Sequence, residues 1–296
     1  MDVAKLAAFL ATNPNVTPDQ IYGVGLCEKS EGHAARLPLV QVPTTAGTGS
    51  EVTPISIVTT GEASKMGVVS PQLLPDWAVL DGELTLGLPQ MTTAHTGVDA
   101  MVHAIEAYTC ATRKNTLSDT LAREALRHLT ANIHAAVFEG ASNAEARAGM
   151  LLGSMYAGMA FANAPVAAVH ALAYPLGSRF KVPHGLSCSL MLPPVAEFNA
   201  PQAAKEYAEL ATILFPEKAK KATGGESELV DVMIQGLQGL LVDLQLPTKL
   251  TDPAIGVQER DVAMLAEEAM KQTRLLPNNP RTVTEADALE IYKSIL

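Results

Sequence analysis

Hydrophobic residues recur with helical spacing along most of the chain after about residue 92. The segments with this spacing are 92–113, 116–139, 143–163, 165–178, 187–196, 202–213, 226–245, 258–271 and 284–295. Many of them are rich in alanine, which favours helix over strand. The pattern therefore predicts that residues 92–296 form an all-helical domain.

The first 91 residues show a different pattern. In the first ten residues, Val3, Leu6 and Leu10 fall on one face of a helix. Four short apolar runs that are typical of strands follow, at 37–42, 53–60, 65–69 and 77–81. We therefore predict an α/β unit over 1–91, followed by the helical domain.

Composition and charge narrow the class of protein. The chain has 296 residues, of which 48% are hydrophobic and 18% charged, so it can bury a large core and disorder is not expected. Its net charge of −10 argues against a nucleic-acid partner, which requires a basic surface. No apolar run is long enough to span a membrane. Three widely separated cysteines without a C-x-x-C spacing are typical of a reducing cytoplasm.

Asp99 and His103 are the first candidates for chemistry. Their spacing of four places both side chains on one face of a helix, about one turn apart. The residues between and around them are apolar, and a buried carboxylate and imidazole need partners. A divalent cation would satisfy both groups. The alternative is a simple hydrogen bond between them on a half-exposed face.

Two further histidines extend this pattern. His170 lies in an alanine-rich apolar segment, and His184 lies between a proline and a glycine. Each alone is compatible with an ordinary buried or turn histidine. Together with Asp99 and His103 they form a set of three imidazoles and one carboxylate, which suits Fe²⁺ or Zn²⁺ and leaves room for an open, catalytic position. His95, four residues before Asp99, is a weaker candidate ligand.

Three motifs occur together in this sequence. They are TTAGTGSE at 44–51, G-V-D-A-x-x-H-A-x-E at 97–106, and HALAYPLG at 170–177, closed by His184-Gly185. In this order and spacing they resemble the signatures of the iron-containing (group III) alcohol dehydrogenases, over the whole chain. The resemblance implies a dinucleotide-binding α/β domain, an all-helical domain in a dehydroquinate synthase-like architecture, and a metal in the cleft between them.

The resemblance also implies roles for individual residues. Asp99, His103, His170 and His184 would bind the metal, Fe²⁺ or Zn²⁺. The nicotinamide cofactor, NAD or NADP, would lie along a set of mostly hydroxyl-bearing side chains: Asp2, Thr44, Thr45, Thr48, Thr53 and Lys65. The metal would polarise the carbonyl of an aldehyde, or stabilise the alkoxide of an alcohol or hydroxy acid, during hydride transfer.

Tyr174 is the candidate catalytic residue that the resemblance adds. Many relatives carry a histidine at this position, and that histidine is often assigned to proton transfer or substrate contact. The phenol of Tyr174 could donate a hydrogen bond in its place. The alternative is that Tyr174 packs ahead of Pro175 without a chemical role.

The family pattern includes a glycine-rich G-G-G-S loop before a helix that reads x-x-D-x-A-K. Met1 to Lys5 matches that helix, so we expect an N-terminally truncated chain, with about 90 preceding residues in relatives. Weak cofactor binding, open strand edges and self-association into a homo-oligomer would follow. Two other interpretations remain: a metal-binding truncated product or subunit without dehydrogenase activity, and a relative of dehydroquinate synthase, which the Asp99 and His103 pair disfavours.

Overall fold

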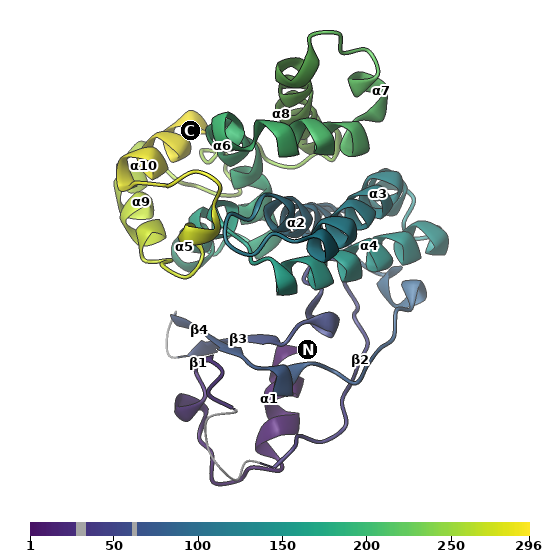
Figure 1. The fold of residues 1–296 in the computed structure, drawn as a ribbon, viewed down its shortest axis with the longest axis vertical. Helices are drawn as coiled ribbons and strands as arrows, with labels where there is room; N and C mark the ends of the chain where they lie inside the picture. The colour runs from purple at the N-terminus through teal and green to yellow at the C-terminus, as the bar shows by residue number, and fades with distance from the viewer. Residues whose placement is uncertain (28–33, 61–63) are drawn as a thin grey trace.

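The computed structural model describes residues 1–27, 34–60 and 64–296. A smaller N-terminal unit of short strands and one helix lies against a larger helical part (Figure 1). The helical part is built around α2, which contacts α3, α4 and α6. The predicted fold class, an α/β unit followed by an all-helical region, is confirmed by this arrangement.

The N-terminal unit contains two small sheets. Its elements are α1 (Asp2–Leu10), β1 (Gly23–Val24), β2 (Val40–Gln41), β3 (Ile55–Thr60), β4 (Ser64–Val69) and β5 (Trp77–Ala78). The first sheet has the order β1-β4-β3, with β1 parallel and β3 antiparallel to β4. In the second sheet, β2 pairs in parallel with β5. The strands predicted at 37–42 and 77–81 are therefore reduced to two residues each.

A buried lysine ties α1 to the strand beside it. Lys5 is fully buried, and its ammonium donates to the carbonyls of Thr53 and Ile55 at 2.8 and 2.7 Å. Asp2 completes the attachment, because its carboxylate accepts from Ser50 Oγ and from the backbone N–H of Ile57. A small core of Leu6, Phe9, Ile21, Cys27, Val68 and Leu73 packs around this junction.

The helical part consists of long helices with short connections. Its α-helices are α2 (Gln90–Thr109), α3 (Thr116–Phe138), α4 (Ala144–Asn163), α5 (Ala168–Phe180), α6 (His184–Leu214), α7 (Pro216–Ala219), α8 (Gly225–Asp243), α9 (Val262–Met270) and α10 (Glu285–Ser294). Short 3₁₀ turns, among them η2 (Ser50–Val52), connect other elements. All the helices predicted after residue 92 are present.

Two predicted helices, 187–196 and 202–213, are joined into the single helix α6. The helix continues through Pro193 and Pro194, and only Ala203 departs from helical backbone angles. Proline costs about 3 kcal/mol inside a helix. Both prolines are buried, and α6 packs on α2, α5 and α8. This packing outweighs the local cost. Both predicted helices are present within α6, and the break between them lies at the kink at Ala203.

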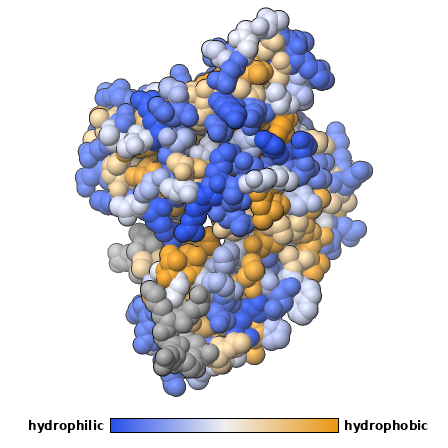
Figure 2. All heavy atoms as spheres, in the orientation of Figure 1, coloured by the Kyte–Doolittle hydropathy of each residue, from blue (hydrophilic) through white to orange (hydrophobic). Residues whose placement is uncertain are grey.

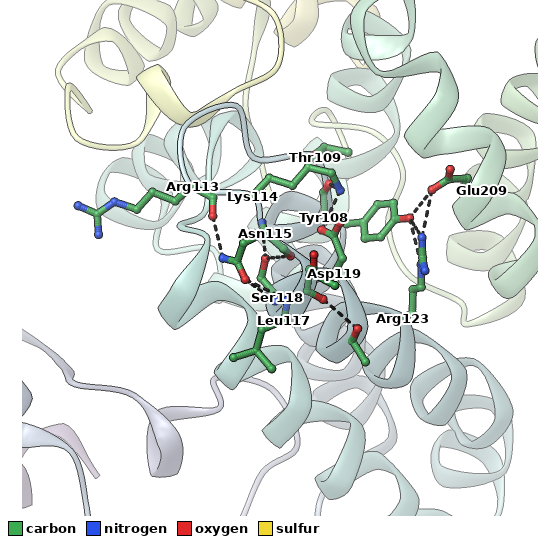
Figure 3. A network of polar contacts seen from close by, with 12 residues as sticks. Tyr108, Thr109, Arg113, Lys114, Asn115, Leu117, Ser118, Asp119, Arg123 and Glu209 are labelled. Carbon is green, nitrogen blue, oxygen red and sulfur yellow. Dashed lines mark hydrogen bonds and ion pairs between the residues drawn. The ribbon is translucent and has the colours of Figure 1, made fainter.

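The C-terminal end of α2 is held by a polar cluster. The phenol of Tyr108 lies between Glu209 of α6 and Arg123 of α3 and bonds to both (Figure 3). Lys114 donates to the carbonyl of Tyr108 at 2.6 Å, and the side chain of Asn115 caps the start of α3. These contacts fix the position of α2 between its neighbours, and α2 carries the site described below.

The two parts of the molecule bury apolar side chains to different extents. Most of the large hydrophobic residues exposed in the described chain belong to the first 91 residues, including Val24, Val40, Trp77 and Val79. In Figure 2, hydrophobic surface gathers where the N-terminal unit meets the helical part. No single helix in the described residues is long and apolar enough to span a bilayer; α4 and α5 pass that test only when taken together across a 108° bend.

The burial of Lys5 makes its contribution to stability increase as the pH becomes alkaline. Burial lowers the pKa of Lys5 to about 8, although Asp2 and Glu51 partly oppose the shift. The unfolded chain, with an ordinary lysine pKa near 10.4, binds more protons between these values, so the contribution of Lys5 to stability rises with pH. We expect the free energy of unfolding of the native chain to gain on the order of 2 kcal/mol relative to Lys5→Met between pH 8 and pH 10.

Denaturant titrations of both proteins at several pH values measure this difference. Other groups that titrate in this range are common to the two proteins and cancel in the comparison. A difference in unfolding free energy that stays constant with pH would show that Lys5 does not change protonation in the folded chain.

Candidate metal centre

Helix α2 places three acidic or imidazole side chains on one face. Asp99, His103 and Glu106 are spaced by four and three residues, so they follow one stripe of the helix. All three are buried, between 2% and 6% exposed. The stripe faces α5 and α6, which bring His170 and His184 to it from other parts of the sequence.

The start of α6 approaches α2 closely because residue 185 is glycine. A Cβ atom at Gly185 would lie 2.5 Å from the carbonyl oxygen of His95 on α2, closer than any real contact allows. The absence of a side chain lets His184, the first residue of α6, come within 3.7 Å (Nε2 to Oδ1) of Asp99. Gly185 therefore has a steric role in assembling the site.

The Nε2 atom of His170 lies near both His103 and Asp99. The group of ligand atoms that all lie within 4.8 Å of one another includes Asp99, His170 and His184, and His103 stands beside this group through its contact with His170. His170 Nδ1 lies 2.6 Å from a carboxylate oxygen of Glu106, and His103 Nδ1 lies 3.2 Å from the carbonyl oxygen of Gly47. A carbonyl or carboxylate oxygen only accepts, so each Nδ1 carries the proton and each Nε2 presents a lone pair. These two Nε2 atoms are only 3.1 Å apart.

Asp99 adds a third lone pair at the same place. Its Oδ1 lies 3.7 Å from His170 Nε2 and is buried with no hydrogen-bond partner among the described residues. Unprotonated nitrogens and an ionised carboxylate this close together in a buried site repel one another unless a cation lies between them. The donor set therefore fits a divalent metal ion and does not fit a simple Asp–His hydrogen bond.

For Asp99 and His103 the electrostatics agree with this donor set, whereas His170, beside two carboxylates, must release any second proton when a metal binds. Burial alone would raise the pKa of Asp99, but the imidazoles of His103, His184 and His170 outweigh it and lower that pKa, so the carboxylate is ionised. Burial lowers the pKa of His103 to about 3, which keeps its ring neutral. For His170, the carboxylates of Glu106 and Asp99 outweigh burial and raise the pKa.

The N-terminal unit helps to orient this centre. The loop after β2 packs on the helical part at two glycines: a Cβ at Gly49 would lie 2.6 Å from Gly158 Cα on α4, and one at Gly47 would lie 3.0 Å from Thr96 Cβ on α2. Gly49 has a φ of +56°, which favours glycine. This close packing places the Gly47 carbonyl against His103, whose other side stacks on Phe161.

Cys188 also belongs to the cluster, although the sequence analysis gave it no role. The potential ligand atoms of Asp99, His170, His184 and Cys188 all lie within 4.8 Å of one another. Cys188 follows His184 by one helical turn, and its Sγ is 3.8 Å from His184 Nε2. The helical spacing of four was the available signal, as it was for Asp99 and His103.

Glu106 was quoted in the motif but was given no function by sequence reasoning. Its two oxygens accept from His170 Nδ1 and from the backbone N–H of Val169, at 2.6 and 2.7 Å. Such a carboxylate fixes the orientation of a ligating imidazole and increases its basicity. Glu106 is therefore a positioning residue for His170.

The predicted catalytic residue lies beside the centre. The ring of Tyr174 is 5.9 Å from that of His184 and 6.5 Å from that of His170, measured between centroids. Burial raises the pKa of Tyr174 to about 12, with a further contribution from Cys188. The phenol is therefore protonated at neutral pH. His95 lies nearby with a buried Nδ1 that lacks a partner among the described residues, and burial lowers its pKa.

The predicted cofactor residues fall into two groups. Thr44, Thr45 and Thr48 lie on the loop that packs against α2 and α4, with Thr44 and Thr48 exposed and Thr45 half-buried. Asp2 and Thr53 are instead engaged in the bonds that hold α1 to β3. The last predicted residue is Lys65, whose side chain lies outside the described part of the chain.

Comparison with known proteins establishes the family. The iron-containing alcohol dehydrogenase model matches residues 1–82, and the model of the C-terminal part of the Fe-containing alcohol dehydrogenase family matches 93–296. The chain therefore belongs to the iron-containing alcohol dehydrogenases, an oxidoreductase family that acts on CH–OH groups. Both the predicted resemblance and the predicted enzyme class are confirmed.

Particular relatives cover the whole chain. It is 37% identical to long-chain-alcohol dehydrogenase 1 of Geobacillus thermodenitrificans, over 99% of this chain and 72% of the relative. The structure of an alcohol dehydrogenase from Oenococcus oeni matches with a TM-score of 0.90 at 32% identity, over 100% of this chain and 74% of that one. The structure of sulfoacetaldehyde reductase from Bifidobacterium kashiwanohense in complex with NAD⁺ matches with a TM-score of 0.83 at 28% identity. The match covers 99% of this chain and 73% of that one.

Removal of a central ligand should abolish metal binding. We expect about one Fe²⁺ or Zn²⁺ per wild-type chain after supply of the metal, and loss of it in His170→Ala and His184→Ala, because each deletes a donor beside Asp99. Elemental analysis after gel filtration measures the content. His134→Ala, an exposed histidine of α3, is the matched control and should keep its metal. A wild-type chain without stoichiometric metal would contradict the site.

Replacement of Glu106 should weaken the metal without removing a ligand. In Glu106→Gln, the amide NH₂ must face one of two donors, the Nδ1–H of His170 or the N–H of Val169, so the imidazole loses its fixed orientation. We expect a 10- to 100-fold loss of metal affinity, on the order typical for such partners. Competition with a chromophoric chelator measures it, with Glu145→Gln on the exposed face of α4 as control. Equal affinities in all three proteins would exclude this role.

Proposed function

We propose that the chain is a metal-dependent, NAD(P)-linked dehydrogenase that interconverts a small alcohol, or hydroxy acid, and its carbonyl compound. Asp99, His103, His170 and His184 hold the metal, Fe²⁺ or Zn²⁺. The observation that carries the proposal is the close approach of the His170 and His103 Nε2 atoms beside an Asp99 oxygen that has no hydrogen-bond partner among the described residues. Membership of an alcohol dehydrogenase family supports it.

The metal, when bound, supplies a positive centre that polarises a carbonyl oxygen or stabilises an alkoxide. The protein residues determine how much positive charge remains. With these four ligands, Asp99 contributes one negative charge and the three imidazoles contribute none, so the centre stays positive overall. Glu106 and the carbonyl of Gly47 keep His170 and His103 in the tautomer that offers Nε2.

Tyr174 is the residue of this chain best placed to contact the reacting oxygen. Its ring borders those of His170 and His184, and its phenol keeps the proton because its pKa is about 12. A protonated phenol can donate a hydrogen bond to a carbonyl oxygen as negative charge develops there. We propose that Tyr174 acts as this hydrogen-bond donor; its high pKa does not suit a general base at neutral pH.

The cofactor would approach from the N-terminal unit. The loop that carries Thr44, Thr45 and Thr48 lies next to the metal centre, because Gly47 of the same loop contacts His103. Exposed hydroxyls on such a loop are available to bind a nicotinamide nucleotide. NAD is our first choice, because the sulfoacetaldehyde reductase structure that resembles this chain holds NAD⁺. Asp2 and Thr53 contribute by holding the α1–β3 junction beneath the loop.

The test is reduction of a short aliphatic aldehyde by NADH, followed at the nicotinamide absorbance with Fe²⁺-loaded and Zn²⁺-loaded protein. We expect turnover in the wild-type chain and a loss of about 100-fold or more in Asp99→Asn, since the metal contributes several kcal/mol to the transition state. His134→Ala should retain wild-type turnover. Stoichiometric metal with neither NADH oxidation nor NADPH oxidation across alcohols, aldehydes and hydroxy acids would favour the metal-binding protein without dehydrogenase activity.

A further inference from the structure

We propose that the thiolate of Cys188 is an additional ligand of the metal in this chain, and that it shifts the preference of the site from Fe²⁺ toward Zn²⁺ and Co²⁺. The inference rests on the metal site of the proposed function and deepens it. It comes from the position of Cys188 beside the metal ligands. Cys188 is not one of the four ligands assigned above, Asp99, His103, His170 and His184.

The geometry of the cluster matches metal ligation by sulfur. Bond lengths of 2.3 Å to sulfur and 2.0–2.1 Å to nitrogen give an S–N separation of about 3.5 Å around a tetrahedral ion. Cys188 Sγ lies 3.8 Å from His184 Nε2, and the Asp99 oxygen lies 3.7 Å from the Nε2 atoms of His170 and His184. For these three pairs, shifts of a few tenths of an ångström would reach ligand distance, and all four atoms lie within 4.8 Å of one another.

The surroundings of Cys188 point in the same direction. The residue is fully buried, and its side chain bonds to the carboxylate of Asp99, whose Oδ1 is itself without a partner. The thiol and the unsatisfied oxygen therefore lie within 4.8 Å of each other in a buried part of the site. Cys110 is equally buried, but its sulfur lies beside Thr112 at the end of α2, away from the cluster.

Sulfur changes the chemistry of the donor set. On binding, the thiol proton leaves to solvent and an S–metal bond replaces the S–H bond, so the ligand charge becomes −2 with Asp99. Thiolate is a soft donor and is common in zinc sites. The added charge and softness stabilise Zn²⁺ and Co²⁺ more than Fe²⁺. Zn²⁺ can also expand to five ligands, so His103 can remain in the set.

Cobalt absorption tests the ligand directly, without enzyme activity. We would titrate metal-free wild-type chain, Cys188→Ser, Cys188→Ala and the control Cys110→Ser with Co²⁺ under anaerobic conditions. We expect a strong near-ultraviolet thiolate-to-cobalt charge-transfer band in the wild type and in Cys110→Ser. The band should be absent from both Cys188 variants. The hydroxyl of Cys188→Ser can still donate a hydrogen bond to Asp99. A missing band in this variant would therefore reflect the loss of the sulfur ligand and not the loss of a hydrogen bond.

Metal competition gives a second measurement. Partners outside the ligand shell already change affinity by 10- to 100-fold, so loss of a ligand should lower the Zn²⁺ affinity of Cys188→Ser about tenfold or more, with a smaller effect on Fe²⁺. Circular dichroism checks that the variants fold.

The possible outcomes separate the two proposals. If wild-type protein binds one Co²⁺ without the band, or if Cys188→Ser has the same spectrum and metal preference, Cys188 is not a ligand and the proposed function stands. If the wild-type chain binds no Co²⁺, Zn²⁺ or Fe²⁺, the proposed metal site fails together with this inference.

Discussion

An ionised carboxylate buried in a helical core is the constraint on which the rest of this structure depends. Asp99 is 2% exposed, and one of its oxygens has no hydrogen-bond partner in the described chain. Burial of such a charge lowers the free energy of unfolding by several kcal/mol unless an opposite charge or hydrogen bonds compensate it. The imidazoles around Asp99 lower its pKa, but this oxygen still has no hydrogen bond among the described residues. A divalent cation resolves the conflict, and the site is therefore a place where stability and function depend on the same ion.

Close backbone packing makes this arrangement possible. Gly185 allows the start of α6 to touch α2, and Gly49 and Gly158 allow the loop after β2 to touch α4. A methyl group at Gly185 would push α6, which carries a ligand, away from α2. A methyl group at Gly49 or Gly158 would push the loop that orients His103 away from α4. The glycines of the family motifs thus have steric reasons in this fold, since each removes atoms from a contact between two backbones.

The N-terminal unit and the helical part meet at the metal centre. The carbonyl of Gly47, on the loop that carries the candidate cofactor threonines, selects the tautomer of His103. A cofactor that moves this loop would also move the hydrogen bond that fixes a metal ligand. The unit itself is held together by Lys5 and Asp2, so the α1–β3 junction supports the site from a distance.

The sequence by itself determined the local elements: the helices after residue 92, the helix at the N-terminus, and the pairing of Asp99 with His103 at one helical turn. Helical periodicity relates near neighbours, and these features depend only on them. Tertiary structure alone decided that Glu106 binds His170, 64 residues away, and that the start of α6 packs against α2 at Gly185. It also brought Cys188 to Asp99. Contacts between distant segments leave no periodic signal in one sequence, because they depend on how the helices pack.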